Sequence, residues 1–524
     1  MKQFYTIVFL ALFIARTNAQ QNTILIIADD VSPDYFGFLS SNTDTAHTPN
    51  LYALSRRAVR FSKAWASPIC SPTRAGIFTG RYSFRTGVGD VIMSASSPQI
   101  SLSEMSIAKL LQAHAPIKYN TACVGKWHLN NNQPSKRLIP NTMGYDLYSG
   151  NFSGAIPSFT NYTRIKNGIL DTVTTYATTQ TVNDAIAWMD TMNTNKPFFL
   201  WLAFNAPHSP YHLPPANLCN TTGLSGTTAH INANPRLYFK AALEALDTEI
   251  GRLIQYLQEN NFIDSTNIIF IGDNGNAPQV AQITRTSRAK NTIYDYGVRV
   301  PFMAAGPAVV NPNRVSSELV NTQDLFATIA ELSGFSNWSN SIPNNTIIDS
   351  RSFLPILKNQ AGTIRSWIFS EQFSSTADPS DGKTIRNQDY HLLRFDNGKE
   401  EFYNQTIDPE ENNNLLIGSM NSTDIANYNF LCDSISLLTG TGSDCLTLST
   451  KHFEIDDTAD IYPNPFSSYL SIGKNKNGNI QMLNSFGQVI YQGNSLEKQD
   501  FSYLSNGVYM IIIGINQYRK VVKN

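Results

Sequence analysis

Residues 23–30 read Thr-Ile-Leu-Ile-Ile-Ala-Asp-Asp, an unbroken apolar run that ends in two adjacent carboxylates. Residues 198–204 (FFLWLAF) and 267–271 (NIIFI) form similar runs, and polar residues bound each of them. Continuous apolar runs of this length are typical of strands buried on both faces, as in a parallel sheet. The sequence therefore predicts a buried, mainly parallel sheet whose first strand ends in acidic side chains.

Amphipathic stretches separate these predicted strands. Residues 236–260 place apolar side chains on one helical face: Leu243, Leu246, Ile250, Leu253, Ile254 and Leu257. Residues 104–114 and 322–334 are predicted to form further helices, the second ending at Gly334. Strands that alternate with helices indicate an α/β domain with a mainly parallel central sheet.

The pattern changes after about residue 370. Residues 388–405 hold an Asp-Asn-Gly turn signal between two short runs, which predicts an antiparallel sheet in a smaller α+β subdomain. From residue 459 onwards, short alternating strands with closely spaced turn residues predict a small β-sandwich. We therefore divide the chain of 524 residues into a catalytic α/β domain (20–370), a C-terminal subdomain (371–452) and a terminal β-domain (459–524).

The overall charge is almost zero, with 39 Lys and Arg against 40 Asp and Glu, and 42% of the residues are hydrophobic. Such a chain is not intrinsically disordered, and it lacks the basic excess that nucleic-acid binding requires. Five cysteines are too few for a disulfide scaffold. Their odd number nevertheless needs an explanation if the protein is exported.

The first 19 residues have the features of a secretory signal peptide: Lys2, an apolar run over residues 7–14, and the small-residue end Thr17-Asn18-Ala19. The alternative, a membrane anchor, needs about 20 apolar residues. The mature chain is expected to begin near Gln20, in an oxidising compartment. There Cys432 and Cys445, which bracket a Gly/Ser/Thr-rich loop, are expected to pair. Pairing of Cys123 with Cys219 stays open.

The most informative motif is Cys-Ser-Pro-Thr-Arg at residues 70–74, followed by Thr-Gly-Arg at residues 79–81. Pro72 favours the first turn of a helix, which places Cys70 just before a helix N-terminus. Free N–H groups and the helix dipole favour an anion there, and Arg74 adds a positive charge one turn later. The alternative for this motif alone is a structural buried cysteine.

Acidic residues follow two of the predicted strands. Asp29 and Asp30 follow the first, and Asp273 and Asn274 follow the strand at 267–271. Three carboxylates and an amide oxygen form a hard, oxygen-only set that suits Ca²⁺ or Mg²⁺. For either pair alone, an exposed acidic turn is the alternative.

Basic residues occur at comparable positions. Lys126 and His128 follow a short run at 121–124, His208 follows the strand at 198–204, and Lys290 precedes residues 294–301. Taken singly, such residues are more often surface residues. Because the carboxyl ends of parallel strands share one edge, where ligands bind in α/β sheets, we predict that all these clusters form one site.

Together these motifs resemble those of type I sulfatases in the alkaline phosphatase superfamily, over roughly residues 22–450. The resemblance implies an alkaline-phosphatase-like α/β sandwich and the activity of a sulfuric ester hydrolase. One departure is visible: Asp295-Tyr296-Gly297 stands where the family often has Glu-Gly-Gly. We expect the tyrosine to reshape the wall of the pocket.

The resemblance also implies a mechanism. A formylglycine-generating or anaerobic sulfatase-maturing enzyme would convert Cys70 to Cα-formylglycine, whose hydrate attacks sulfur. One Ca²⁺ would be held by Asp29, Asp30, residue 70, Asp273 and Asn274. The other roles would be charge neutralisation by Lys126 and Lys290, anchoring of the hydrate by Arg74, protonation of the leaving group by His208, and deprotonation of the second hydroxyl by His128.

The C-terminal residues resemble a type IX secretion sorting domain, used by Bacteroidota, through Tyr-Pro-Asn-Pro at 462–465 and the ending at 504–523. This implies contact with the type IX secretion machinery and a secreted or cell-surface protein that crosses the periplasm. The alternative is an ordinary carbohydrate-binding or spacer domain.

The predicted function is therefore hydrolysis of sulfate esters in sulfated polysaccharides or oligosaccharides, from algae or animal glycosaminoglycans. A phosphatase or phosphodiesterase of the same superfamily is one alternative, although these usually present Ser or Thr and two Zn²⁺. A non-catalytic glycan-binding surface protein is the alternative from another class. Nucleic acid is not an expected partner.

Overall fold

The computed structural model describes residues 21–192, 196–360, 362–376, 378–440, 445, 461–473, 480–484, 488–513 and 517–524. The predicted signal peptide (1–19) lies outside these residues. The chain divides into two compact units. The first comprises the residues up to 401 together with 405–413, and the second comprises 402–404 together with 414–524. Each unit is described by itself.

A ten-stranded sheet forms the centre of the first unit, in the order β11-β2-β10-β9-β1-β8-β4-β5-β6-β7. The five central strands β9, β1, β8, β4 and β5 pair in parallel, which confirms the mainly parallel sheet expected from the apolar runs. Strands β6, β7 and β10 pair antiparallel with their neighbours. The bounds are β1 (Asn22–Ala28), β2 (Ala58–Phe61), β4 (Asn120–Lys126), β5 (Leu147–Asn151), β6 (Tyr162–Lys166), β7 (Ile169–Val173), β8 (Phe198–Ala203), β9 (Thr266–Gly272), β10 (Phe302–Ala305) and β11 (Arg314–Ser316).

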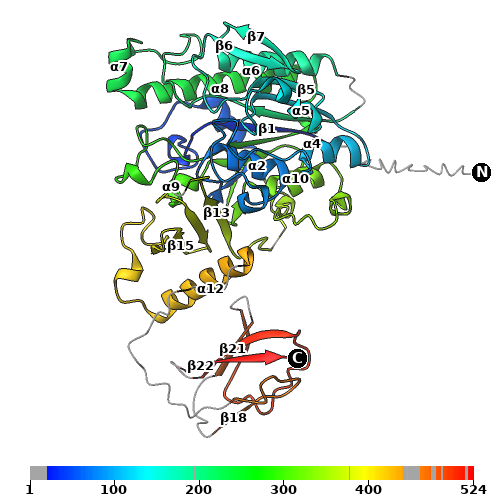
Figure 1. Cartoon of the computed structure of the whole chain (residues 1–524), viewed down its shortest axis with the longest axis vertical. Coiled ribbons are helices and arrows are strands. Elements are labelled where there is room, and N and C mark those ends of the chain that lie inside the picture. The colour runs from blue at the N-terminus through cyan, green and yellow to red at the C-terminus, as the bar shows by residue number, and fades with distance from the viewer. Residues whose placement is uncertain are drawn as a thin grey trace, which may run out of the picture. The chain divides into compact units, whose positions relative to one another are not determined.

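Helices cover both faces of this sheet (Figure 1). In β1, Ile24 and Ile26 pack in one hydrophobic core, while Leu25 and Ile27 pack in the other. The first core includes residues of α1 (Pro49–Ser55), α6 (Ala177–Asp190) and α8 (Pro235–Glu259). The second includes residues of α2 (Cys70–Thr79), α4 (Ile107–Lys109), α10 (Asp324–Leu332) and α11 (Leu354–Leu357). The unit is therefore the α/β sandwich that the sequence predicts.

Two predicted helices begin later than expected. The helix predicted at 104–114 begins at Ile107 and continues as a π-helix over Leu110–His114. The Ser106 side chain accepts a hydrogen bond from Lys109 N and so caps the helix at its start. The helix predicted at 322–334 is α10, whereas the helix predicted at 236–260 matches α8 within one residue at each end.

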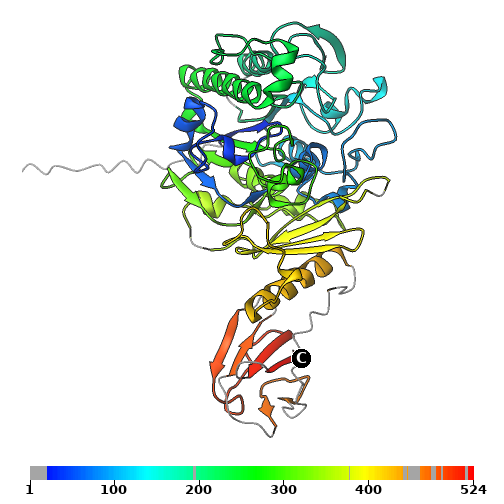
Figure 2. The same cartoon turned by 90° about the vertical axis from the view of Figure 1, so that its left-hand side faces the viewer.

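A smaller antiparallel sheet lies beyond α10 in sequence. Strands β13 (Ile368–Gln372), β14 (Gly382–Arg386) and β15 (Tyr390–Phe395) pair antiparallel, as expected (Figure 2). The predicted Asp-Asn-Gly turn follows β15, with Gly398 at φ +85°, and leads into β16 (Glu400–Asn404). The first unit also contains the short helices α3 (Ser83–Thr86), α5 (Ile139–Thr142), α7 (Thr228–Ala233) and α9 (Asp295–Val298), and a two-stranded sheet of β3 (Ala64–Trp65) and β12 (Val320–Asn321).

The second unit holds α12 (Ser422–Thr439) and two antiparallel sheets, β17-β18 and β20-β19-β21-β22. Phe466, Leu470, Met482, Phe501 and Ile511 form its core, in agreement with the predicted β-domain. The bounds are β17 (Ile461–Tyr462), β18 (Ser471–Ile472), β19 (Ile480–Leu483), β20 (Val489–Gly493), β21 (Gly507–Ile513) and β22 (Gln517–Lys523).

The cysteines resolve into one pair and three free thiols. Cys432 and Cys445 form a disulfide, which confirms that prediction. Cys70, Cys123 and Cys219 are free, so Cys123 and Cys219 do not pair. Among the described residues, no helix has both the length and the apolar character needed to cross a membrane.

Candidate active site

Four adjacent strands, β9, β1, β8 and β4, end at one edge of the sheet and bring the predicted polar clusters together. Asp29 and Asp30 directly follow β1, and Asp273 and Asn274 directly follow β9. Lys126 is the last residue of β4. The predicted strand was shorter and had placed Lys126 in the following loop. His128 and His208 lie in the segments after β4 and β8.

Helix α2 brings Cys70 to this edge. Cys70 is the first residue of α2 and not, as expected, the residue before it, because the helix already begins with the hydrogen bond from Thr73 N to Ile69 O. Pro72 lies in the first turn as predicted, where no N–H is needed. Gly80 ends the helix in the left-handed conformation, at φ +71°.

Arg74 fastens this helix to the sheet. Its Nε and one terminal nitrogen donate to Asp273 Oδ2, at 3.2 and 2.7 Å, and the other terminal nitrogen donates to the Lys126 carbonyl at 2.9 Å. Burial raises the pKa of Asp273, but the charges of Arg74, Lys126 and Lys290 together outweigh it, and this pKa is lower than usual. Arg74 thus fixes the start of α2 against the ends of β9 and β4.

The two carboxylates after β1 each face a lysine. Lys126 Nζ lies 2.6 Å from Asp29 Oδ2, and Lys290 Nζ lies 2.5 Å from Asp30 Oδ1. Burial and the neighbouring Asp273 raise the pKa of Asp29 to about 6. Burial also acts to raise the pKa of Asp30, but Lys290 together with His208 and Lys126 lowers this pKa below its usual value. We call Asp29, Asp30, Arg74, Lys126, Asp273, Asn274 and Lys290 the active-site cluster.

Two oxygens of this cluster fit a hard metal ion. Asp29 Oδ1 and Asn274 Oδ1 are buried and have no hydrogen-bond partner. Carboxylate and amide oxygens are the ligands that Ca²⁺ prefers, and buried polar atoms are otherwise almost always paired. Asp29, Asp30 and His208 bring ligand atoms within 4.8 Å of one another. The residues present therefore fit a hard cation, as the sequence predicts, and are compatible with the Ca²⁺ that the resemblance implies.

His128 faces the thiol of Cys70, with 3.1 Å between Nδ1 and Sγ. Its Nε2 lies 3.3 Å from the Ile92 carbonyl, which only accepts hydrogen bonds, so Nε2 carries the proton and Nδ1 is the acceptor. Burial, followed by the charge of Lys126, lowers the pKa of His128 well below its usual value. A neutral imidazole therefore presents a lone pair to residue 70.

Backbone strain marks two residues of this site. Asp30 and His128 adopt left-handed φ angles of +64° and +55° without being glycine. Such conformations cost about 1 to 3 kcal/mol each and cluster at functional sites. Each aims its side chain at the same edge of the sheet, Asp30 toward Lys290 and His128 toward Cys70.

Asn276 was not predicted from the sequence, although it connects the segment after β1 with the segment that carries Lys290. Its Oδ1 accepts from Ser32 N at 2.8 Å, its Nδ2 donates to Asp30 O at 3.3 Å, and its carbonyl accepts from Lys290 N at 2.8 Å. The available signal was the second asparagine in Asp-Asn-Gly-Asn, two residues after a predicted ligand.

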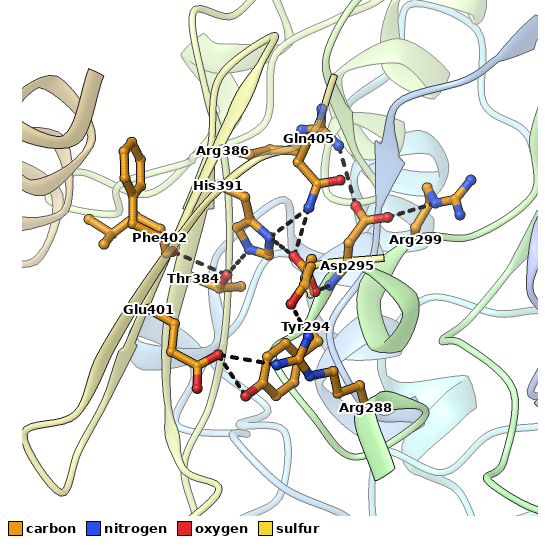
Figure 3. Close-up of polar contacts among 12 residues, drawn as sticks. Arg288, Tyr294, Asp295, Arg299, Thr384, Arg386, His391, Glu401, Phe402 and Gln405 are labelled. Atoms are coloured by element: carbon orange, nitrogen blue, oxygen red, sulfur yellow. Dashed lines mark hydrogen bonds and ion pairs between the residues drawn. The ribbon is translucent and has the colours of Figure 1, made fainter. Parts of the chain in front are cut away.

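Asp295, the first residue of the Asp295-Tyr296-Gly297 segment, belongs to a second group of buried charges (Figure 3). Asp295 accepts hydrogen bonds from Trp65 Nε1 at 2.9 Å, Arg299 Nε at 2.8 Å and Arg386 at 3.3 Å. Its backbone N donates to Glu411, which also pairs with His391. We call Asp295, Arg299, Arg386, His391 and Glu411 the Asp295 cluster.

Tyr296 donates its hydroxyl to Asp34 at 2.6 Å and lines a cavity of about 150 Å³ together with Arg288 and Glu410. None of the predicted site residues lines this cavity. The tyrosine therefore shapes a cavity beside the Asp295 cluster, while the expected effect on the wall of the active site stays a prediction.

Comparison with known protein families agrees with this geometry. Residues 21–335 match the model described as Sulfatase. The chain belongs to the sulfatase family. Residues 288–428 of this sulfatase match the C-terminal region of N-sulphoglucosamine sulphohydrolase, and residues 460–524 match the secretion system C-terminal sorting domain.

Individual relatives are distant. Arylsulfatase J of Mus musculus is 28% identical over 331 residues, which cover 60% of this sulfatase and 52% of arylsulfatase J, so the chain spans about half the length of that relative. The ulvan-active sulfatase of Formosa agariphila is 23% identical over 416 residues, with coverages of 75% and 77%. The crystal structure of Ps i-CgsB in complex with k-i-k-neocarrahexaose has a TM-score of 0.66 at 24% identity, covering 80% of this chain and 92% of that one, and shows a shared fold.

Proposed function

We propose that this sulfatase hydrolyses sulfate esters of a sulfated glycan, with formylglycine formed from Cys70 and one bound Ca²⁺. The observation that carries the proposal is the 3.1 Å contact of Cys70 Sγ with the unprotonated Nδ1 of His128. Burial raises the pKa of the Cys70 thiol, so the unmodified side chain stays protonated. Because the thiolate is the reactive form, the unmodified thiol is a weak nucleophile. A converted residue 70 would supply, as its hydrate, the hydroxyl that attacks sulfur.

His128 would accept a proton from residue 70. Nδ1 is the nearer nitrogen, and the Ile92 carbonyl holds the ring in the tautomer that leaves this atom free. The neutral state favoured by burial and by Lys126 is the state that a general base requires. After transfer of the sulfate group, loss of the proton from the second hydroxyl would reform the aldehyde while the C–O bond to sulfate breaks, so that inorganic sulfate leaves and residue 70 is regenerated.

Asp29, Asp30, Asp273 and Asn274 would hold the Ca²⁺. The ion would supply positive charge for the non-bridging oxygens of the sulfate group. Lys126 and Lys290 lie beside the first two ligands and would add their ammonium charges to the same oxygens. Arg74 would keep the helix start and Asp273 in place.

His208 would give a proton to the leaving oxygen as an imidazolium, in which both ring nitrogens carry a proton. Its Nδ1 would donate to the Ser209 carbonyl at 2.7 Å, and the proton on Nε2, which lies 3.5 Å from Asp30 Oδ2, would be the one transferred. The His208 side chain is 15% exposed, compared with 0% for Lys126. It therefore lies on the solvent side of the carboxylates, where the alcohol of the ester would leave.

The relatives and the sorting domain support the proposed substrate and location. The ulvan-active sulfatase and the fold shared with Ps i-CgsB support a sulfated glycan as the substrate. The match at 460–524, together with the predicted signal peptide, supports export to the cell surface or the medium by type IX secretion. A formylglycine-generating or anaerobic sulfatase-maturing enzyme would be the required partner. We keep the boundaries 20–370, 371–452 and 459–524 as proposed domains.

A paired assay tests the reaction. Purified protein is incubated with 4-nitrophenyl sulfate and 4-nitrophenyl phosphate, and sulfate release is then followed from oligosaccharides of ulvan, carrageenan and chondroitin sulfate. We expect turnover of the aryl sulfate and of at least one oligosaccharide. Preference for the phosphate ester would support the phosphatase alternative. Glycan binding without any turnover would support the non-catalytic alternative.

A further inference from the structure

Asn291 stands at the junction of two segments that build the active site. The preceding residue, Lys290, reaches Asp30 with its ammonium group and donates its backbone N–H to Asn276. The backbone N of Asn291 donates to the Pro68 carbonyl at 2.9 Å, two residues before Cys70. The backbone at 290–291 therefore connects the carboxylate edge with the segment that carries the nucleophile.

The smaller sheet holds the side chain of Asn291. Gln372, at the end of β13, donates its Nε2 to Asn291 Oδ1 at 2.9 Å. Gln372 is 3% exposed, and its own Oε1 has no hydrogen-bond partner. Next along the chain, Phe373 N donates to Gly89 O, near Ile92 whose carbonyl orients His128. The end of β13 thus borders the site beside both Lys290 and the His128 partner.

The Nδ2 amide group of Asn291, a hydrogen-bond donor, is the part of its side chain that is available to a ligand. Asn291 is exposed, and its Oδ1 is occupied by Gln372. In the part of the chain that the structure describes, no group accepts a hydrogen bond from its Nδ2. The backbone is left-handed at φ +70°, a conformation that asparagine tolerates better than most residues. A specific, constrained conformation thus presents an amide N–H pair next to Lys290.

We propose that Asn291 binds the sugar from which sulfate is removed, by donating a hydrogen bond from Nδ2 to one of its oxygens, and that Gln372 is a positioning residue for it. The inference rests on the proposed sulfatase function and adds the chemistry of the leaving group. A sugar ring offers hydroxyl and ether oxygens that accept from an amide, whereas an aryl leaving group offers no such oxygens beside the ester. Asn291 therefore distinguishes sugar sulfates from aryl sulfates.

Asn291→Gly tests the proposal, because glycine keeps the left-handed backbone while the side chain is removed. The measurement is the ratio of kcat/KM for the best oligosaccharide of ulvan, carrageenan or chondroitin sulfate to kcat/KM for 4-nitrophenyl sulfate. Loss of one hydrogen bond should lower this ratio about 5- to 10-fold. The matched control is Asn345→Gly, another exposed asparagine with a left-handed φ of +69°, which should leave the ratio unchanged.

Gln372→Met tests the positioning role. It removes the amide and keeps the length of the side chain, and it should lower the same ratio about 2- to 5-fold through Asn291. In the Asn291→Gly background the second substitution should have no further effect on the ratio. A ratio unchanged by Asn291→Gly, or effects of the two substitutions that simply multiply, would overturn the proposal. Turnover of 4-nitrophenyl sulfate with no release from any sulfated oligosaccharide would overturn the sugar contact while leaving the sulfatase chemistry intact.

Discussion

The active-site cluster and the Asp295 cluster are two groups of buried charges in the same unit, and they differ in how completely their members are paired. In the Asp295 cluster, the Asp295 carboxylate accepts from three side chains. Burial raises the pKa of Asp295, but Arg299 and then Arg386 lower it below its usual value. In the active-site cluster, Asp29 Oδ1 and Asn274 Oδ1 have no hydrogen-bond partner, and the pKa of Asp29 is raised to about 6.

This difference indicates that the Asp295 cluster stabilises the fold, whereas the active-site cluster is arranged to bind a ligand. Buried polar atoms that lack partners are costly, and they persist in a native structure where a ligand or ion satisfies them. Fully paired buried charges need no further partner. Substitutions in the active-site cluster should therefore change activity more than stability, and those in the Asp295 cluster should do the reverse.

Cys70→Ala should have the largest effect on activity. If Cys70 supplies the nucleophile, as proposed, kcat for sulfate esters should fall by about 10⁴-fold or more. Differential scanning calorimetry should show little change in Tm, because the side chain is small. The control is Cys123→Ala, a second buried free cysteine, which should lower stability by about 1 kcal/mol and keep kcat. Comparable kcat losses in both variants would contradict the assignment.

Removal of metal should affect only the active-site cluster. Treatment with EGTA should lower kcat at least about 100-fold, and Ca²⁺ should restore it. Added Ca²⁺ should also stabilise the fold, by about 2.7 kcal/mol at 100 times its Kd, which raises Tm. Asn274→Ala should abolish this Tm shift. Gln405→Ala, beside Glu411 in the other cluster, should retain it, and its loss in both variants would indicate a site elsewhere.

Asp295→Asn should lower stability more than activity, the reverse of what we expect in the active-site cluster. It leaves Arg386 buried without its carboxylate, and breaking such a pair costs about 3 to 5 kcal/mol. Tm should fall by several degrees, while kcat of the folded protein should stay within about 3-fold of the wild type. Asp29→Asn is the matched substitution in the active-site cluster. If Asp295→Asn lowers kcat as strongly as Asp29→Asn does, the two clusters do not have separate roles.

Glu371→Gln should have the smallest effect, visible only as a change in pH dependence. Burial raises the pKa of Glu371 to about 7, so the folded protein binds this proton more tightly than the unfolded chain. Stability should then decrease as the pH rises from about 5 to 8, by about 2 kcal/mol from this group. The glutamine variant should lack that decrease because it still accepts from Phe84 N without titrating. Urea unfolding at pH 5 and 8 measures the difference, with exposed Glu259→Gln as the control.

The sheet and its polar edge could be predicted because local patterns encode them. The apolar run at 23–28 and the acids at 29 and 30 are adjacent in sequence, and parallel strands place their carboxyl ends together. The left-handed backbone at His128 could not be predicted, because tertiary packing imposes it. Nor could the Asp295 cluster, since its members come from positions as distant as 295 and 411 and no local pattern links them.

The central claim is that Cys70 is converted before the enzyme works. Mass spectrometry of the peptide that contains residue 70, taken from enzyme of known specific activity, tests it most directly. The account predicts an aldehyde or its hydrate at position 70 and activity in proportion to the converted fraction. Fully active enzyme whose residue 70 is an unmodified thiol would contradict it.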